Sequence, residues 1–346
     1  MKDLKDLVRP DIWALRPYGS VRGEHDGQAV RVLLDANENP YNSPLNRYPD
    51  PLQTELRLKL AQVKGVPADC VFLGNGSDES VDLCYRVFCT PYVDNVVAIE
   101  PTCDIYKVRA DINGVGYRPV LLDDSFQISA SRLLAACDSH TKLIWICSPN
   151  NPTGNNMLCE EVEKVLRGFD GIVVIDEAYS DFSRQRPFRS RMGEFPNMIV
   201  LNTFSKAWGC AAIHLGMAFA GRDVVGLFDK VRCPWNINAL TQRQALDAWA
   251  DRHRVHEWVN RLLQERARVM RAFCELPFCV QVYPSDANFF LAKMADAQAV
   301  YDYLVSLGIV VRNCTRVALC RDCLRVTIGA VGENTELIGA LRRWNR

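Results

Sequence analysis

The sequence lacks an excess of charge of either sign. Among its 346 residues, 41 are Lys or Arg and 41 are Asp or Glu, so its formal net charge is zero. A chain without a basic field has no general attraction for the phosphates of nucleic acid or for anionic lipid. We therefore expect small-molecule partners, with no nucleic acid and no membrane among them.

Long apolar runs are also absent. The amino terminus, MKDLKDLVRPDIW, is charged, and no later stretch approaches the roughly 20 apolar residues of a membrane-spanning helix. These absences predict a cytoplasmic protein. Internal repeats and low-complexity tracts are missing too, and the 48% of hydrophobic residues is typical of an ordinary globular chain.

Cysteine is plentiful, but its arrangement does not indicate a disulfide framework. The 14 cysteines are scattered along a chain without a secretory signal, so we expect most of them to be reduced and buried. Cys320 and Cys323 form a CxxC pair, yet no second such pair and no nearby histidine completes a zinc site. We expect no bound metal.

Short apolar segments rich in β-branched residues recur between longer amphipathic ones. They are VVAIE from 96, KLIWICSP from 142, GIVVIDEA from 171 and NMIVLNTFS from 197. Such runs are typical of buried parallel strands, and CEEVEKVLRGF from 159 has apolar residues at helical spacing. The alternation predicts a three-layer α/β/α domain with a mostly parallel sheet.

After residue 235 the pattern changes to long charged helices over 241–274 and then to the strand-like segments VQVYPSDANFFLAK and CLRVTIG. A chain of this length exceeds what one hydrophobic core usually supports. We therefore predict a large domain over 35–235 and a smaller α+β domain over 236–346. Residues 1–34 are predicted to be an arm that packs with the small domain.

Polar residues follow several of the predicted strands, where ligands bind in open α/β sheets. They occur at 148–154, 176–179 and 203–206, and a Gly-Asn-Gly-Ser turn at 74–77 precedes an apparent helix. Such a turn offers backbone N–H groups to a phosphate. A lysine beside it can condense with a cofactor aldehyde, and a carboxylate can pair with a protonated pyridine nitrogen.

Three of these segments, NPTG at 151–154, DEAY at 176–179 and SKAWG at 205–209, resemble the signature of fold-type I pyridoxal-phosphate aminotransferases in order and separation. Four more, LDANENPY, RYPDP, GNGSDE and LRVTIG, make the chain similar to the histidinol-phosphate aminotransferases of histidine biosynthesis. The resemblance implies a homodimeric enzyme with pyridoxal 5'-phosphate. Its reaction would exchange an amino group between histidinol phosphate and 2-oxoglutarate.

The resemblance also implies roles for individual residues. Lys206 would hold the cofactor and move the proton, Asp176 would face the pyridine nitrogen, and Asn151 and Tyr179 would hydrogen-bond the ring oxygen. The remaining implied contacts are Ser77, Asp78, Thr203 and Ser205 with the cofactor phosphate, Tyr106 with the ring face, Tyr48 with the phosphate of the neighbouring subunit's cofactor, Arg325 with the substrate anion, and Tyr18 and Asn37 with the substrate.

Two departures from the family pattern stand out. His214 takes the place of an arginine that pairs with the cofactor phosphate, so we expect weaker cofactor retention. Cys103 and Asp104 stand where the family more often has an aromatic residue and a glycine. Three other functions stay open: threonine-phosphate decarboxylation, a broad aromatic aminotransferase activity, and a decayed protein that only binds the cofactor.

Overall fold

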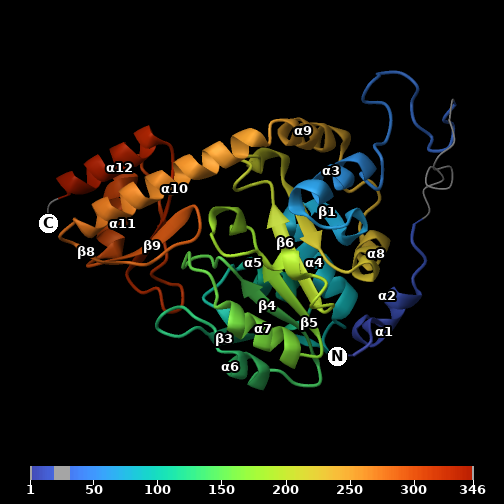
Figure 1. Cartoon of the computed structure of the whole chain (residues 1–346), viewed down its shortest axis with the longest axis horizontal. Helices are drawn as coiled ribbons and strands as arrows, with labels where there is room; N and C mark the ends of the chain where they lie inside the picture. The colour runs from blue at the N-terminus through green and yellow to red at the C-terminus, as the bar shows by residue number, and fades with distance from the viewer. Residues whose placement is uncertain (1, 19–31, 345–346) are drawn as a thin grey trace.

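The computed structural model describes residues 2–18 and 32–344, and it contains two β-sheets (Figure 1). The larger sheet has seven strands in the order β1-β7-β6-β5-β4-β2-β3. Its strands are β1 (Val71–Asn75), β2 (Asn95–Glu100), β3 (Gly116–Leu121), β4 (Thr141–Cys147), β5 (Ile172–Asp176), β6 (Met198–Thr203) and β7 (Leu215–Phe219). Of these, β7 runs antiparallel to both neighbours. Its amino end therefore lies at the edge where the other strands have their carboxyl ends.

The central strands form because their sequences are apolar on both faces. Every residue of β5, β6 and β7 is buried, as expected for a sheet that helices cover. The helices of this region are α3 (Thr54–Lys64), α4 (Gly76–Phe88), α5 (Ile105–Ile112), α6 (Ala130–Ala135), α7 (Cys159–Gly168) and α8 (Arg222–Val231). Helix α4 contacts β7, α5 and α8, and α6 contacts α7. The predicted α/β class with a mostly parallel sheet is confirmed.

The second sheet belongs to the smaller domain and is antiparallel, in the order β10-β11-β9-β8. Its strands are β8 (Cys279–Val282), β9 (Phe289–Met294), β10 (Arg312–Asn313) and β11 (Cys323–Thr327). The helices after residue 235 are α9 (Ala239–Ala250), α10 (His253–Cys274), α11 (Ala297–Ser306) and α12 (Val331–Arg343). In Figure 1, α10 runs from the large domain to the small one. Apolar residues of α10, α11, α12, β9 and β11 form a separate core.

The amino-terminal helices α1 (Leu4–Leu7) and α2 (Pro10–Ala14) pack against the large domain, which corrects the prediction that this arm packs with the small one. The backbone N–H of Arg9 donates to the carbonyl oxygen of Val87 in α4 at 3.0 Å. The Nζ of Lys230 in α8 donates to the carbonyl oxygen of Trp13 at 3.0 Å. The sequence of the arm does not specify which domain its few apolar side chains pack against. The other domain boundaries stay predictions.

Within residues 2–18 and 32–344, no helix is long and apolar enough to cross a membrane. All fourteen cysteines are free thiols. Over the same residues, no group of three or more His, Cys, Asp or Glu side chains could hold a metal ion.

A close backbone approach joins β7 to the start of α4. Gly216 in β7 pairs with Gly74 of β1 on one side and with Thr203 of β6 on the other. A Cβ atom on Gly216 would overlap the carbonyl carbon of Gly76 and the amide nitrogen of Ser77. These are backbone atoms that cannot rotate away. Only glycine therefore lets the first turn of α4 sit against the edge of the sheet.

We predict that Gly216→Ala lowers the free energy of unfolding by about 3 kcal/mol, because the new methyl group overpacks against the α4 backbone. Urea denaturation followed by circular dichroism measures this. Gly226→Ala is the matched control: nothing lies within 4 Å of a Cβ at that exposed position in α8. It should raise stability by about 0.5 kcal/mol, because alanine favours a helix interior. Equal stability of the two variants would contradict the prediction.

Candidate active site

Polar residues from four strands meet at the carboxyl edge of the large sheet. Asp176 ends β5 and Thr203 ends β6, while the turn after β1 begins α4 at Gly76. His214 precedes β7 at the same edge. The sequence predicted this gathering from the position of polar residues after apolar runs, and the sheet order places them side by side.

Asp176 is a buried carboxylate with two hydrogen bonds. Its side chain is 7% exposed. Its Oδ1 accepts from the backbone N–H of Ala178 at 3.0 Å, and its Oδ2 accepts from the hydroxyl of Tyr106 at 2.6 Å. Burial raises the pKa of Asp176, and the two hydrogen bonds oppose that rise because they stabilise the ionised form. This carboxylate is the group that the sequence predicted to face a pyridine nitrogen.

Tyr106 lies deeper than its predicted stacking role requires. The residue has no exposed surface, and its ring stacks on Trp145 with 4.8 Å between centroids and 13° between planes. A ring enclosed in this way does not fit the prediction that it covers a cofactor face. Its hydroxyl contact with Asp176 was not found from the sequence, because helical spacing does not show which strand end a side chain reaches.

Cys103 is nearer the open part of the site. It is partly buried and lines a cavity together with Thr102 and Asp104. Burial raises its pKa to about 11, and the negative charge of Asp176 adds to the rise. The thiol is therefore protonated near neutral pH and acts as a small apolar wall.

Glu177, the residue after Asp176, points away into a buried ionic network. Alternation along the chain sends the two adjacent carboxylates in different directions. Glu177 accepts from the backbone N–H of Phe188 and from Arg189 Nη1, the latter at 3.1 Å. Burial raises its pKa to about 7, and Arg189 opposes that rise. In the DEAY segment, Asp176 thus serves the site and Glu177 holds the loop behind it.

Lys206 stands exposed on a tight turn after β6. The N–H of Gly209 donates to its carbonyl oxygen at 3.1 Å, and Gly209 has a φ of 65°. Trp208 is buried and stacks on Phe204 at 4.5 Å, which anchors the turn. The Nζ of Lys206 lies 5.7 Å from the ring centroid of Tyr179. The amine therefore extends over the residues that follow β5.

The start of α4 forms a cradle with the chemistry of an anion site. Its first turn leaves N–H groups without helical partners, and the helix dipole favours negative charge there. The hydroxyls of Thr203 and Ser205 lie 3.1 Å apart, and Thr203 pairs with Gly216, which abuts Ser77. The structure therefore brings together the predicted phosphate residues Ser77, Thr203 and Ser205.

His214 borders this cradle through its backbone and its ring. Its carbonyl oxygen accepts from the N–H of Gly76, and a Cβ on Gly76 would lie 2.5 Å from Cε1 of the imidazole. Its Nε2 lies 3.6 Å from Oδ2 of Asp78. His214 itself has a φ of 48°. The residue that replaces the family arginine thus lies at the predicted phosphate site.

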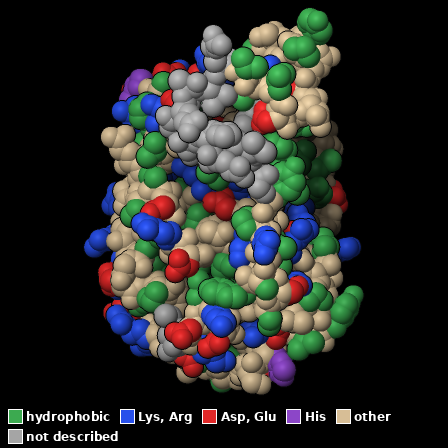
Figure 2. Space-filling model, turned by 90° about the vertical axis from the view of Figure 1, so that its right-hand side faces the viewer, with side chains coloured by type: hydrophobic (Ala, Val, Ile, Leu, Met, Phe, Trp, Pro, Cys, Tyr) green, Lys and Arg blue, Asp and Glu red, His purple; other side chains and the backbone are tan. Residues whose placement is uncertain are grey.

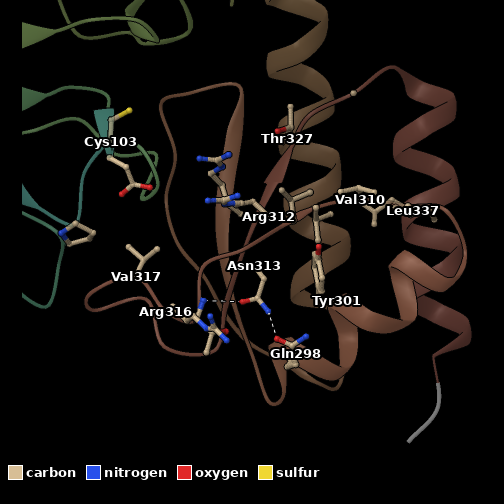
Figure 3. Close-up of a pocket in the computed structure, with 18 of the residues that line it drawn as sticks. Cys103, Gln298, Tyr301, Val310, Arg312, Asn313, Arg316, Val317, Thr327 and Leu337 are labelled. Carbon is tan, nitrogen blue, oxygen red and sulfur yellow. Dashed lines mark hydrogen bonds between the residues drawn. The ribbon is translucent and has the colours of Figure 1, made fainter. Parts of the chain in front are cut away.

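A cavity of about 1300 Å³ opens between the two domains and contains Arg325. Figure 3 shows Cys103 on the large-domain side and Arg312 on the small-domain side. Nη1 of Arg325 donates to Oδ1 of Asn151, so the predicted substrate arginine touches the predicted ring-binding asparagine. The ring of Tyr179 packs edge-on against the ring of Phe289, with 5.0 Å between the ring centroids.

Arg312 is a site residue that the sequence did not reveal. It pairs directly opposite Arg325 in the β10–β11 ladder. Like charges opposite each other in a ladder repel, so the pair favours an anion between or beside the two guanidinium groups. Within residues 2–18 and 32–344, neither arginine forms an ion pair with a carboxylate, and Arg316 lines the same cavity. The sequence does not show that β10 pairs with β11, and only this pairing places Arg312 beside Arg325.

Tyr18 and Tyr48 lie apart from this cavity. Tyr48 stacks on Trp235 at 4.1 Å and 15°, and Tyr18 meets the same ring edge-on at 6.2 Å. Both tyrosines are exposed, at 69% for Tyr18 and 47% for Tyr48. Asn236, next to Trp235, accepts from Nδ2 of Asn75 at 2.7 Å, so this aromatic group adjoins the start of α4.

Asn37 also lies outside the cavity wall that contains Arg325. It is exposed, with a φ of 54°, on the segment that leads to Tyr48. Figure 2 shows the side of the molecule near these segments, where hydrophobic side chains gather at the surface. The predicted substrate contacts of Tyr18 and Asn37 stay predictions.

The fold and the site define an aminotransferase of class I and II, whose family model matches residues 20–343. The chain belongs to that family. Within it, the chain is similar to the histidinol-phosphate aminotransferase of Bacteroides fragilis, with 54% identity over 99% of this chain and 100% of the relative. The predicted resemblance and the predicted enzyme class are thereby confirmed.

Two solved structures share the fold. One is the histidinol-phosphate aminotransferase of Clostridium acetobutylicum, with a TM-score of 0.79 and 23% identity over 86% of this chain and 90% of that one. The other is the histidinol-phosphate aminotransferase of Sinorhizobium meliloti in complex with pyridoxal-5'-phosphate. Its TM-score is 0.78, with 24% identity over 85% of this chain and 82% of that one.

Pyridoxal phosphate is the cofactor of this aminotransferase family and of this chain. The described residues fit it at three points. The cradle at the start of α4 suits its phosphate, the buried carboxylate of Asp176 suits its ring nitrogen, and the exposed amine of Lys206 suits its aldehyde. Asn151 contacts Arg325, and the ring centroid of Tyr179 lies 5.7 Å from Nζ of Lys206.

We predict that His214→Ala weakens the binding of pyridoxal phosphate and that His214→Arg strengthens it by about tenfold, because a guanidinium group bonds a phosphate through two N–H groups. Titration of the apoenzyme, followed by protein fluorescence, measures the affinity.

His140→Ala is the control for this experiment, because His140 precedes β4 at the opposite edge of the sheet and lies 3.8 Å from Asp94. Its cofactor affinity should equal that of the wild type. An affinity that His214→Ala leaves unaltered would show that His214 does not hold the phosphate.

Proposed function

We propose that the chain exchanges an amino group between histidinol phosphate and 2-oxoglutarate. The observation that carries the proposal is the pair of arginines, Arg312 and Arg325, in the cavity that Asn151 joins to the cofactor site. Relatives with up to 54% identity over the full chain are named histidinol-phosphate aminotransferases, which supports the same substrate here.

In this proposal each residue has a physical task. The bound cofactor supplies an electron sink that makes the Cα proton of the amino substrate acidic. Nζ of Lys206 would hold the cofactor before the reaction and, once released, would take that proton and give it back. Asp176 keeps a negative charge beside the ring nitrogen, while Asn151 and Tyr179 orient the ring oxygen. The cradle at the start of α4 prevents the ring from shifting during the proton transfer.

The arginine pair accounts for two substrates of different shape. Arg325 alone can hold a carboxylate through two parallel N–H groups, which suits glutamate and 2-oxoglutarate. A phosphate monoester carries more charge and more acceptor oxygens, so Arg312 adds a second guanidinium for histidinol phosphate. The same pair also suits other phosphorylated amines. The bond that is broken at Cα then decides between transamination and decarboxylation.

We also propose that the site is completed in a homodimer. Tyr18 and Tyr48 are exposed aromatic residues beside the start of α4, and Leu34, Tyr41 and Leu45 in the neighbouring segment are exposed too. An apolar surface of this kind beside a cofactor cradle suits a second copy of the chain. Tyr48 would then reach the partner subunit's cofactor phosphate. A cytoplasmic location belongs to this proposal as well.

We predict that glutamate bleaches the visible band of the enzyme loaded with pyridoxal phosphate, and that the ketone of histidinol phosphate restores it. Borohydride reduction should attach the cofactor to Lys206, and Lys206→Ala should lose the visible band. Absorption spectroscopy and peptide mass spectrometry measure these results. Carbon dioxide released from threonine phosphate would instead establish the decarboxylase, and a band that no amino substrate changes would indicate a protein that only binds the cofactor.

We predict that Arg312→Gln raises the KM for histidinol phosphate by roughly 10- to 100-fold, because it removes a charge-assisted hydrogen bond to the phosphate. The KM for glutamate should change much less, because Arg325 still holds its carboxylate. Steady-state kinetics with each substrate measure this. Arg316→Gln is the matched control, since Arg316 lines the same cavity without facing Arg325. A smaller effect in Arg312→Gln than in Arg316→Gln would contradict the assignment.

A further inference from the structure

The hydroxyl of Tyr106 is the polar group at the site for which the proposed reaction has no use. It lies 2.6 Å from Oδ2 of Asp176 and donates to it. Burial raises the pKa of Tyr106 far above its ordinary value, so the hydroxyl keeps its proton over the whole working range of pH. It is therefore a permanent donor to the carboxylate.

Tyr106 is held rigidly, which makes this donor a precise one. Its ring is enclosed in the core on α5 and stacks on Trp145 of β4. Trp145 is itself fully buried. A side chain packed on such a platform loses little further entropy when its hydroxyl is bonded, so the bond can set the orientation of its partner.

Asp176 needs a fixed hydrogen-bond donor because some of its surroundings favour the neutral acid and others favour the ionised carboxylate. Desolvation favours the neutral acid, and the nearby carboxylate of Asp78 adds to that effect. Lys206 and the N–H of Ala178 favour the ionised form. A carboxyl group that took up a proton here could not hold a protonated pyridine nitrogen. The Tyr106 hydroxyl donates to Oδ2 and the N–H of Ala178 donates to Oδ1, which leaves the remaining lone pairs of the carboxylate for the cofactor.

We propose that Tyr106 is a positioning residue that orients the Asp176 carboxylate toward the cofactor ring nitrogen and keeps it ionised. The inference rests on the proposed function, because it assigns Asp176 the task of holding that nitrogen protonated. It replaces the stacking role predicted from the sequence with a role behind the carboxylate. Tyr106 then affects the reaction without touching substrate or cofactor.

The test compares two tyrosines of the same aromatic group. Tyr106→Phe removes the hydroxyl that bonds Asp176. Tyr85→Phe removes a buried hydroxyl that donates to the carbonyl oxygen of Tyr106 at 2.7 Å and does not bond Asp176, and the Tyr85 ring also stacks on Trp145. We expect Tyr106→Phe to weaken pyridoxal phosphate binding on the order of tenfold, as for loss of a hydrogen bond to a charged group. Tyr85→Phe should stay within about twofold of the wild type.

A double-mutant cycle shows whether Tyr106 acts through Asp176. In an Asp176→Asn background the charge is gone, so adding Tyr106→Phe should change the cofactor affinity by less than about twofold. A spectroscopic readout comes from cofactor labelled with ¹⁵N in its ring. The pH at which this nitrogen loses its proton should be lower in Tyr106→Phe than in the wild type, and unchanged in Tyr85→Phe. If Tyr106 had only a structural role, its effect on cofactor affinity would not depend on Asp176, and Tyr106→Phe would not shift the pH at which the ring nitrogen loses its proton.

Three results would overturn the inference: equal affinities of the Tyr106→Phe and Tyr85→Phe proteins, an undiminished effect of Tyr106→Phe in the Asp176→Asn background, or an unshifted ¹⁵N titration. Failure of the proposed function is a separate result. It would appear in the wild type, as an enzyme that binds pyridoxal phosphate with its ring nitrogen protonated yet does not transfer the amino group of histidinol phosphate.

Discussion

The register of the strands in the large sheet is the constraint on which the whole site depends. Cys147 lies opposite Asp176, and Thr203 lies opposite Gly216, so the strands end or begin within a residue or two of one another. Parallel strands in register bring the residues after them to one edge. The carboxylate, the lysine turn and the anion cradle are adjacent for this reason.

The NPTG segment at 151–154 connects the carboxyl edge of the large sheet to the small domain. Asn150 is fully buried, donates to the carbonyl oxygen of Pro101 and accepts from Thr102, so it ties the loop after β2 to the loop after β4. Gly154 accepts from the N–H of Asp286 at 2.7 Å, in the loop between β8 and β9. The domains therefore meet at the same loop in which Asn151 bonds Arg325. The predicted cofactor site and the predicted substrate subsite are therefore linked through one short segment.

The two departures from the family pattern lie at different parts of the site. His214 stands beside the phosphate cradle, where charge and reach decide how well the cofactor is held. Cys103 stands in the wall of the cavity near Asp176, where a larger side chain would narrow the space. Lys206, Asp176 and Arg325 are untouched by either change. Neither change touches the residues predicted to carry the chemistry, so the predicted effects are confined to cofactor retention and pocket shape.

The sequence by itself determined the α/β class, the central strands and most of the residues at the sheet edge. Buried parallel strands require continuous apolar runs, and the residues that follow them must lie at the ligand edge, so both are visible in linear order. Tertiary structure alone decided the Tyr106–Asp176 bond, the Arg312–Arg325 pairing and the docking of α1 and α2 on the large domain. Each joins segments that local pattern does not relate, such as two residues 70 positions apart. Which partner a side chain meets depends on the packing of the whole chain.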